Sequence, residues 1–337
     1  MSRIRLGGIK VLENRAYVSS LCRNTDALED ICSGLAAHRI NMGLVAYAAP
    51  IGTGESMTAV SARSATSLTS FVHPDAGRVG CAWNVIEAVC RISVFPHDKR
   101  PDVTAALIGS LNDGGVKPHG FASSPSAITV VISSRDLHAA MERVFDAFSF
   151  PACESYREWQ SASRAQEGTG PEVRCRYHED VIHVYDLSRL DGLDLWNVAL
   201  PLDLLGDFGK ALLDLGQSRI EMSFLVSGPS TGEGGINFAF CLAAEHRDKA
   251  TQIFHEKIQD RDLSRLGPVL VLFLHGPHFG DRYGIADALA SCLRNSGISP
   301  LALSCVMSSI SLVIKASDAA QTIKALSTSF QTPAPNL

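Results

Sequence analysis

An internal repeat constrains the fold of this chain more than any other feature of its sequence. Residues 101–150 and residues 283–330 each predict a helix, a Ser-rich strand, a strand of Ile and Val, and a closing helix. In the first copy, apolar side chains recur at helical spacing in Val103, Leu107 and Leu111, and the pattern becomes extended from Ile128 onward. The same change of period in both segments predicts an α+β fold built from a repeated βαββα-like unit.

The rest of the chain divides into further copies of this unit. Residues 14–68 carry an expected strand at 16–21, a helix at 26–37, a hairpin across 42–63 and a helix near 64–72. Residues 151–178 are polar, contain Gly and Pro, and show neither period, which predicts a linker. The expected units are residues 1–78, 79–150, 179–262 and 263–331, although residues 6–12 fit either unit 1 or unit 2.

The third unit is the most divergent copy. Its expected elements are a strand at 181–187, a helix at 201–215, a hairpin across 220–242 and a helix at 245–258. It departs from the other units in an extra stretch at 188–200 and in the Gly-rich turn at 227–235.

Composition narrows the class of protein. Apolar residues make up 46% of the 337 residues and charged residues 19%, which is enough apolar material for several cores. The net charge is −5 without a basic cluster, so we expect neither nucleic acid nor an anionic membrane as a partner. The apolar runs are too short to cross a bilayer, and we expect a cytoplasmic protein. Nine cysteines without a CxxC pair predict reduced, mostly buried thiols.

Short motifs recur at matching places in the units. Arg39-Ile40-Asn41-Met42 follows the first helix, Lys99-Arg100-Pro101-Asp102-Val103-Thr104 leads into the first helix of unit 2, and the loop 276–285 holds several glycines. Together with the order of the elements, these motifs resemble the ACT domain, a ferredoxin-like βαββαβ module that senses small molecules. The likeness spans nearly the whole chain, and the regulatory region of aspartate kinases is the most similar arrangement.

The resemblance implies four ACT-like units in tandem. Aspartate kinases carry a catalytic domain with a phosphate-binding loop before this region, whereas here the first expected strand already begins at residue 16. We therefore expect no kinase domain and no enzyme activity. Leu6-Gly7-Gly8-Ile9-Lys10 only superficially matches such a loop, because no strand–loop–helix frame surrounds it.

In such a unit the loop before the first helix presents backbone N–H groups and a partial positive charge to a carboxylate. The resemblance implies that a neighbouring unit supplies the acceptors for an ammonium group. Unit 4 is the favoured site, although its loop also fits a plain Gly-rich connector and Asp26 also fits a helix cap. The expected ligand-binding residues are Asn24, Thr25, Asp26, Ala27, Asn41 and Tyr47 in unit 1, Asp98, Asp102 and Val103 in unit 2, and His278, Gly280, Asp281, Gly284 and Ile285 in unit 4.

Other kinds of site are not expected. His275 and His278 have no thiol or carboxylate at zinc spacing, so we expect no metal and no cofactor. Gly228-Pro229-Ser230-Thr231-Gly232 has the spacing of a hydrolase elbow, but a strand-like segment follows it instead of a helix. No catalytic residues are therefore assigned.

The sequence thus predicts a non-catalytic regulatory protein that binds a small amino acid at the junctions between units and acts on a partner, such as an enzyme of amino-acid biosynthesis. The alternative is a structural or interaction module of ACT repeats that has lost ligand binding. An enzyme on a ferredoxin-like scaffold is a third hypothesis. Because one chain carries two pairs of units, we expect a monomeric pseudo-dimer, with a homodimer as the alternative.

Overall fold

The computed structural model describes residues 3–23, 27–52, 55–62, 81–166, 182–230, 234–258, 263–276 and 282–333. The strands of the two halves are β1 (Ile4–Arg5), β2 (Gly8–Cys22), β3 (Met42–Ala48), β4 (Ser56–Ala62), β5 (Cys81–Phe95), β6 (Pro118–Ser123), β7 (Ile128–Ser133) and β8 (Phe148–Ser149), then β9 (Ile182–His183), β10 (Asp186–Pro201), β11 (Met222–Pro229), β12 (Gly235–Ala243), β13 (Leu263–His275), β14 (Ala302–Val306), β15 (Ser309–Lys315) and β16 (Phe330–Gln331). The α-helices are α1 (Ala27–Ala37), α3 (Pro101–Asp113), α4 (Leu137–Ala147), α5 (Tyr156–Gln166), α6 (Leu205–Gln217), α7 (Arg247–Ile258), α8 (Ile285–Asn295) and α9 (Ala319–Ser329).

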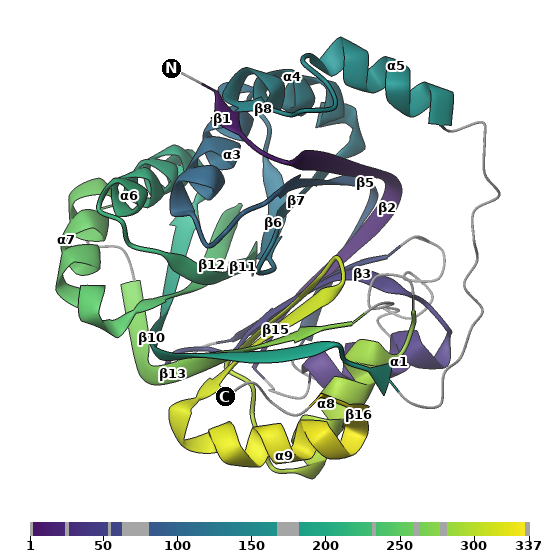
Figure 1. Cartoon of the computed structure of the whole chain (residues 1–337), viewed down its shortest axis with the longest axis vertical. Coiled ribbons are helices and arrows are strands. Elements are labelled where there is room, and N and C mark those ends of the chain that lie inside the picture. The colour runs from purple at the N-terminus through teal and green to yellow at the C-terminus, as the bar shows by residue number, and fades with distance from the viewer. Residues whose placement is uncertain are drawn as a thin grey trace.

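The main strands close into one hydrogen-bonded ring in the order β10-β12-β11-β6-β7-β5-β2-β4-β3-β14-β15-β13. The ring is flattened into two facing layers with helices on their outer sides (Figure 1). Units 2 and 3 form one layer, covered by α3, α4, α6 and α7, while units 1 and 4 form the other, covered by α1, α8 and α9. The prediction of four tandem ferredoxin-like units is confirmed.

Three apolar cores hold these layers together. One lies between the units 2 and 3 sheet and its helices and contains Phe208, Phe238 and Phe254. A second lies under α1, α8 and α9 and contains Leu289 and Leu312. A third core lies between the two sheets. Successive residues of a strand point to opposite faces of its sheet, and in these strands the face toward the other sheet is apolar as well as the face toward the helices.

Two pairs of long strands each serve two units. Residues 8–12 of β2 pair with residues 91–95 of β5 in the sheet of unit 2, whereas residues 16–22 of β2 pair with β4 in the sheet of unit 1. The register shifts around Arg15, where the strand passes from one sheet to the other. The strands β10 and β13 repeat this exchange between units 3 and 4, with register shifts around Leu193. Residues 8–12 therefore complete unit 2.

The two halves of the chain are structural copies of each other. The parallel pair β1–β8 in the first half corresponds to β9–β16 in the second. Arg15 in the first half occupies the position that Leu193 occupies in the second half. Arg15 pairs with Val89 of β5, and Leu193 pairs with Val269 of β13. Val89 and Val269 in turn pair with Ser133 and Lys315, the last residues of β7 and β15. The halves join through β3–β14 and β6–β11, and through the helix pairs α1–α8 and α3–α6.

The structure differs from several expectations. The stretch 188–200, expected as an insertion, is the body of β10, which is long because it serves two sheets. Helix α5 lies within the expected linker, where Tyr156 stacks on Trp159 at a ring distance of 5.9 Å. The helix expected near 64–72 lies outside the described residues.

The expectation of reduced thiols is wrong at Cys22, which forms a disulfide. The residue at the paired position of β5 is Cys81, so the strand register brings two cysteines opposite each other. Spacing along the sequence could not show this, because the two positions belong to different expected units. Cys32, Cys90 and Cys241 are free and buried, as predicted.

Candidate ligand-binding clefts at the unit junctions

The pairing of units 1 and 4 places the start of a helix from one unit beside a strand of the other. β3 and β14 run antiparallel, with Ala48 opposite Ala302 and Leu44 opposite Val306. The start of α8 therefore lies near the start of β3, and the start of α1 lies near the approach to β14. A helix start carries backbone N–H groups without partners in the helix and a partial positive charge.

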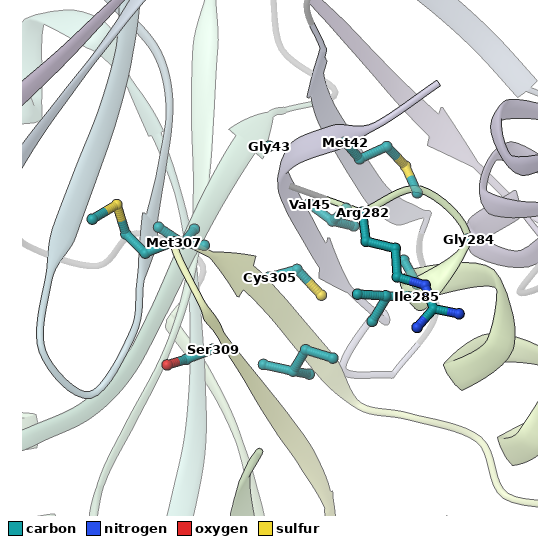
Figure 2. Close-up of a pocket in the computed structure, with 12 residues that line it drawn as sticks. Met42, Gly43, Val45, Arg282, Gly284, Ile285, Cys305, Met307 and Ser309 are labelled. Carbon is teal, nitrogen blue, oxygen red and sulfur yellow. The ribbon is translucent and has the colours of Figure 1, made fainter. Parts of the chain in front are cut away.

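The α8 cleft is formed by Met42, Gly43 and Val45 of unit 1 with residues 282, 284–286, 305–307, 309 and 310 of unit 4. Arg282 and Ile285 lie along it opposite Cys305 (Figure 2). Gly284, at a φ of 87°, is the residue before the helix, and as a glycine it offers no side-chain acceptor to the first N–H groups of α8. The cavity volume of about 20 Å³ holds little more than one water.

The α1 cleft is larger, with a volume of about 500 Å³, which lies in the usual range of small-molecule sites. Unit 1 contributes Leu28 and Glu29 at the start of α1 and Tyr47 near the end of β3. Unit 4 contributes the end of α8, the approach to β14, and the charged residues Lys315 and Asp318. Both signs of charge therefore line one cleft.

Glu29 and Arg294 form an ion pair across this cleft, which joins α1 to α8. The Glu29 side chain is 17% exposed and the Arg294 side chain is 62% exposed. Arg294 is thus accessible to a ligand from solvent, while Glu29 lies deeper. The ion pair connects unit 1 to unit 4.

The α3 cleft lies at the junction of units 2 and 3 and has a volume of about 420 Å³. It is lined by residues 98–102 and by the end of α6 with Arg219, Ile220 and Glu221. Arg100 holds Asp102 with two hydrogen bonds, from Nε to Oδ1 at 3.2 Å and from Nη2 to Oδ2 at 2.5 Å, and this contact raises the pKa of Arg100. The backbone N–H of Met222 donates to the Lys99 carbonyl at 2.9 Å. Arg100 and Asp102 therefore already satisfy each other.

The structure distributes the sequence-predicted residues over these clefts. Tyr47 lines the α1 cleft, Asp98 and Asp102 line the α3 cleft, and Gly284 and Ile285 line the α8 cleft. Ala27 is the first residue of α1. Asn24, Thr25, Asp26, His278, Gly280 and Asp281 lie outside the described residues.

Two predicted residues do not fit a ligand site as expected. Val103 is fully buried in the core under α3, because it lies on the apolar face of that helix. Asn41 precedes β3 while Tyr47 lies near its other end, and six residues of strand span roughly 20 Å. These two side chains therefore do not share one cleft.

Sequence reasoning missed Glu29, Arg294, Lys315 and Asp318. Glu29 meets the three residues of unit 4 only through the β3–β14 register, which joins segments about 250 positions apart. In the sequence they look like ordinary charged positions at the ends of helices or, for Lys315, at the end of a strand.

Within the described residues, no group of three His, Cys, Asp or Glu side chains could hold a metal ion, and no helix is long and apolar enough to cross a membrane. Ser230 of the Gly-x-Ser-x-Gly stretch follows β11 in the turn toward β12, and its N–H donates to the carbonyl of Gly235 at 3.3 Å. The turn is therefore a hairpin connection and not the strand-to-helix elbow of a hydrolase.

No protein-family model matches the sequence, and no curated protein matches it. Among solved structures, the aspartate kinase from Synechocystis is similar over 98% of this chain and 57% of its own, with a TM-score of 0.76 and 14% identity. The regulatory subunit of aspartate kinase from Thermus thermophilus, in a ligand-free form, aligns with 43% of this chain and 99% of its own, with a TM-score of 0.38 and 17% identity.

This chain spans little more than half of the Synechocystis enzyme, so the match concerns part of that protein. At 14% identity the likeness establishes the fold and not the activity. The resemblance to the tandem ACT units of an aspartate kinase regulatory region, inferred from the sequence, is thus confirmed at the level of the fold.

Proposed function

We propose that this chain is a non-catalytic regulatory protein that binds a small amino acid in the α1 cleft. The observation that carries the proposal is a cleft of suitable volume between units 1 and 4 that is lined by the opposite charges of Lys315 and Asp318. Lys315 suits a carboxylate and Asp318 suits an ammonium group, while Glu29 and Arg294 hold each other at the edge of the cleft. An amino-acid zwitterion carries both groups.

A ligand in this cleft would contact both halves of the chain, because α1 belongs to the first half and α8 to the second. It would therefore favour the relative position of units 1 and 4 in which both contacts are made. A ligand changes a conformational equilibrium only through such a difference in affinity. We infer that the response is passed to a partner protein, which the fold suggests is an enzyme of amino-acid biosynthesis.

The test is thermal melting of the purified protein against a panel of the standard amino acids. At one hundred times its dissociation constant, a ligand stabilises the folded state by about 2.7 kcal/mol. We expect a selective stabilisation in the native protein that is lost in Asp318→Ala and Lys315→Ala. The matched control is Asp136→Ala, because Asp136 occupies the position of Asp318 in unit 2. A shift that survives both cleft substitutions would place the ligand elsewhere.

A second candidate is a structural module that holds a partner without a ligand. The α3 cleft favours this function, because Asp102 already accepts two hydrogen bonds from Arg100 and is therefore not available to a ligand. The same melting panel separates the two functions, since a structural module would show no selective shift with any amino acid.

We infer further that one chain is sufficient to build the junctions, because β3–β14 and β6–β11 join its own halves. Light scattering should then give the mass of a monomer. A stable dimer would show that the junctions are completed between chains, as in the homodimer alternative.

A further inference from the structure

Arg91 is a buried cation in the middle of β5, opposite Leu12 of β2 and Val131 of β7. Only 8% of the residue is exposed. Its guanidinium lies directly against Gly43 of unit 1, where a Cβ would overlap the terminal nitrogens. The glycine therefore allows this side chain to lie between the two sheets.

Among the described residues, none accepts a hydrogen bond from Arg91 or forms an ion pair with it, and its buried Nε has no acceptor. The charge that acts on it is another cation, Arg15, on the neighbouring strand. Burial and the charge of Arg15 together lower the pKa of Arg91 to about 10. Burying a charge without a counter-ion is costly, so this arrangement calls for an anion.

The second half of the chain shows that the fold itself does not need this cation. The register places Val271 at the position of Arg91, Leu193 at that of Arg15 and Ser223 at that of Gly43. Val271 and Leu193 are buried in the core between the sheets. The same backbone is therefore stable with apolar side chains at both arginine positions.

We propose that Arg91, with Arg15 beside it, binds a small oxyanion at this end of the interface between the sheets. The ligand group is a carboxylate or a phosphate, which the planar guanidinium can hold through two parallel hydrogen bonds. The site is separate from the α1 cleft and does not depend on the proposed amino-acid ligand. The residue is not sealed from solvent, since 8% of it is exposed.

The probes are sodium phosphate and sodium succinate, each titrated against sodium chloride at constant ionic strength while the melting temperature is measured. The native protein should show a saturable rise with at least one probe. The variant Arg91→Val copies Val271 and should lose the saturable rise. The control Arg135→Val removes an exposed arginine of unit 2 and should keep it.

Saturation by phosphate alone would identify a phosphate group as the ligand, and saturation by succinate alone would identify a carboxylate. Without either probe, Arg91→Val should melt at or above the temperature of the native protein, because it removes an uncompensated buried charge. Isothermal calorimetry on the native protein provides a direct measurement that needs no variant. An equal rise in Arg91→Val, an absence of saturation with both probes, or failure of Arg91→Val to fold would each overturn the proposal.

Discussion

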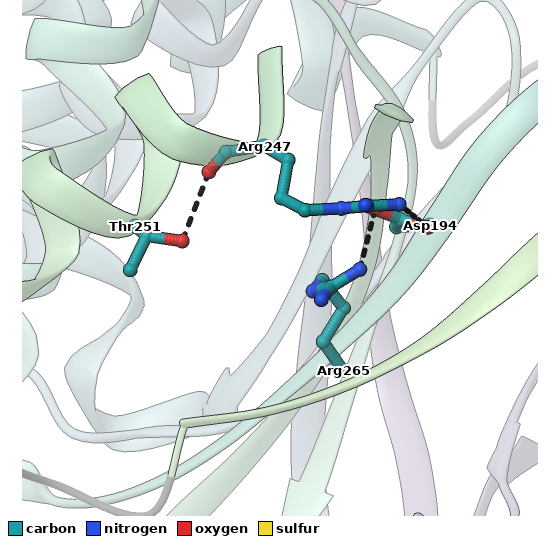
Figure 3. A network of polar contacts seen from close by, with 4 residues as sticks. All are labelled: Asp194, Arg247, Thr251 and Arg265. Carbon is teal, nitrogen blue, oxygen red and sulfur yellow. Dashed lines mark hydrogen bonds and ion pairs between the residues drawn. The ribbon is translucent and has the colours of Figure 1, made fainter. Parts of the chain in front are cut away.

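Arg247 donates two hydrogen bonds to the buried carboxylate of Asp194, from Nε to Oδ2 at 2.9 Å and from Nη2 to Oδ1 at 3.2 Å (Figure 3). Arg265 of β13 adds a third from Nη1 at 3.0 Å and lies 5.8 Å from the ring centre of Trp196. Asp194 is 1% exposed and lies where β10 passes from unit 4 to unit 3. Helix α7 and β13 are thus joined at the strand crossing.

The variant Asp194→Ala should destabilise the protein by about 3 kcal/mol, because three charge-assisted hydrogen bonds are lost at a buried position. Urea unfolding measures this change. The control Asp191→Ala removes an exposed carboxylate that pairs with Arg189, and it should cost less than about 1 kcal/mol. Equal effects of the two substitutions would show that the buried network contributes nothing beyond a surface ion pair.

The free energy of unfolding should decrease as the pH is lowered, because His97 is protonated more readily in the unfolded state. This residue is 2% exposed, and its Nε2 lies 3.1 Å from the hydroxyl of Thr104. Burial lowers its pKa to about 4, an effect that the charge of Asp102 opposes and that of Arg100 reinforces. The unfolded state, with a pKa of about 6.5, binds the proton first.

Because the folded state binds fewer protons between these two pKa values, the contribution of His97 is complete above about pH 6.5 and is lost as the pH falls to about 4. The total change is on the order of 3 kcal/mol. Urea unfolding across this range should show the loss in the native protein and a flatter profile in His97→Gln. A profile with the same slope in both proteins would assign the pH dependence to other groups.

Gly120 should not tolerate a side chain. A Cβ at this position would lie 2.5 Å from the Tyr17 hydroxyl and 2.9 Å from the Ser227 carbonyl oxygen, and the hydroxyl itself donates to the His119 carbonyl at 3.0 Å. Gly120→Ala should therefore cost about 1–3 kcal/mol.

The matched substitution is Gly109→Ala in α3, where nothing lies within 4 Å of a new Cβ. It should stabilise the protein by about 0.5–1 kcal/mol through the higher helix propensity of Ala. Urea unfolding of both variants gives the comparison. Stabilisation by Gly120→Ala would mean that β6 can move away from β11 without cost.

The helices and strands of the repeat could be predicted because the spacing of apolar residues that identifies each of them lies within a short segment of sequence. The helix from Pro101 and the strand from Ile128 begin where the apolar spacing changes in the sequence. The crossing of β2 and β10 between sheets could not be predicted, since both faces of these strands are buried in part and give no single alternation. Helix α5 was not predicted because its sequence is mostly polar. Tyr156 and Trp159 are its main apolar residues, and two such residues do not establish a helical period.

The candidate site was predictable only in part. Gly284, which precedes α8, and Asp102, in the first turn of α3, follow from the pattern of loop and helix, and both line clefts. The charged residues of the α1 cleft depend on which strands pair between halves, and nothing local in the sequence sets that pairing. The residue opposite Cys22 could not be inferred either, because cysteine spacing does not show that the end of β2 pairs with the start of β5.

The exchanged strands limit how this protein can be divided. Units 1 and 2 hold β2 and β5 in common, so excision of either unit would remove an edge strand from the sheet of the other and leave its backbone groups unpaired. Neither unit is a self-contained domain that could be expressed alone. Units 3 and 4 are bound together in the same way through β10 and β13. Partial opening should therefore involve a whole half of the chain, and the half is the smallest cooperative block of this molecule.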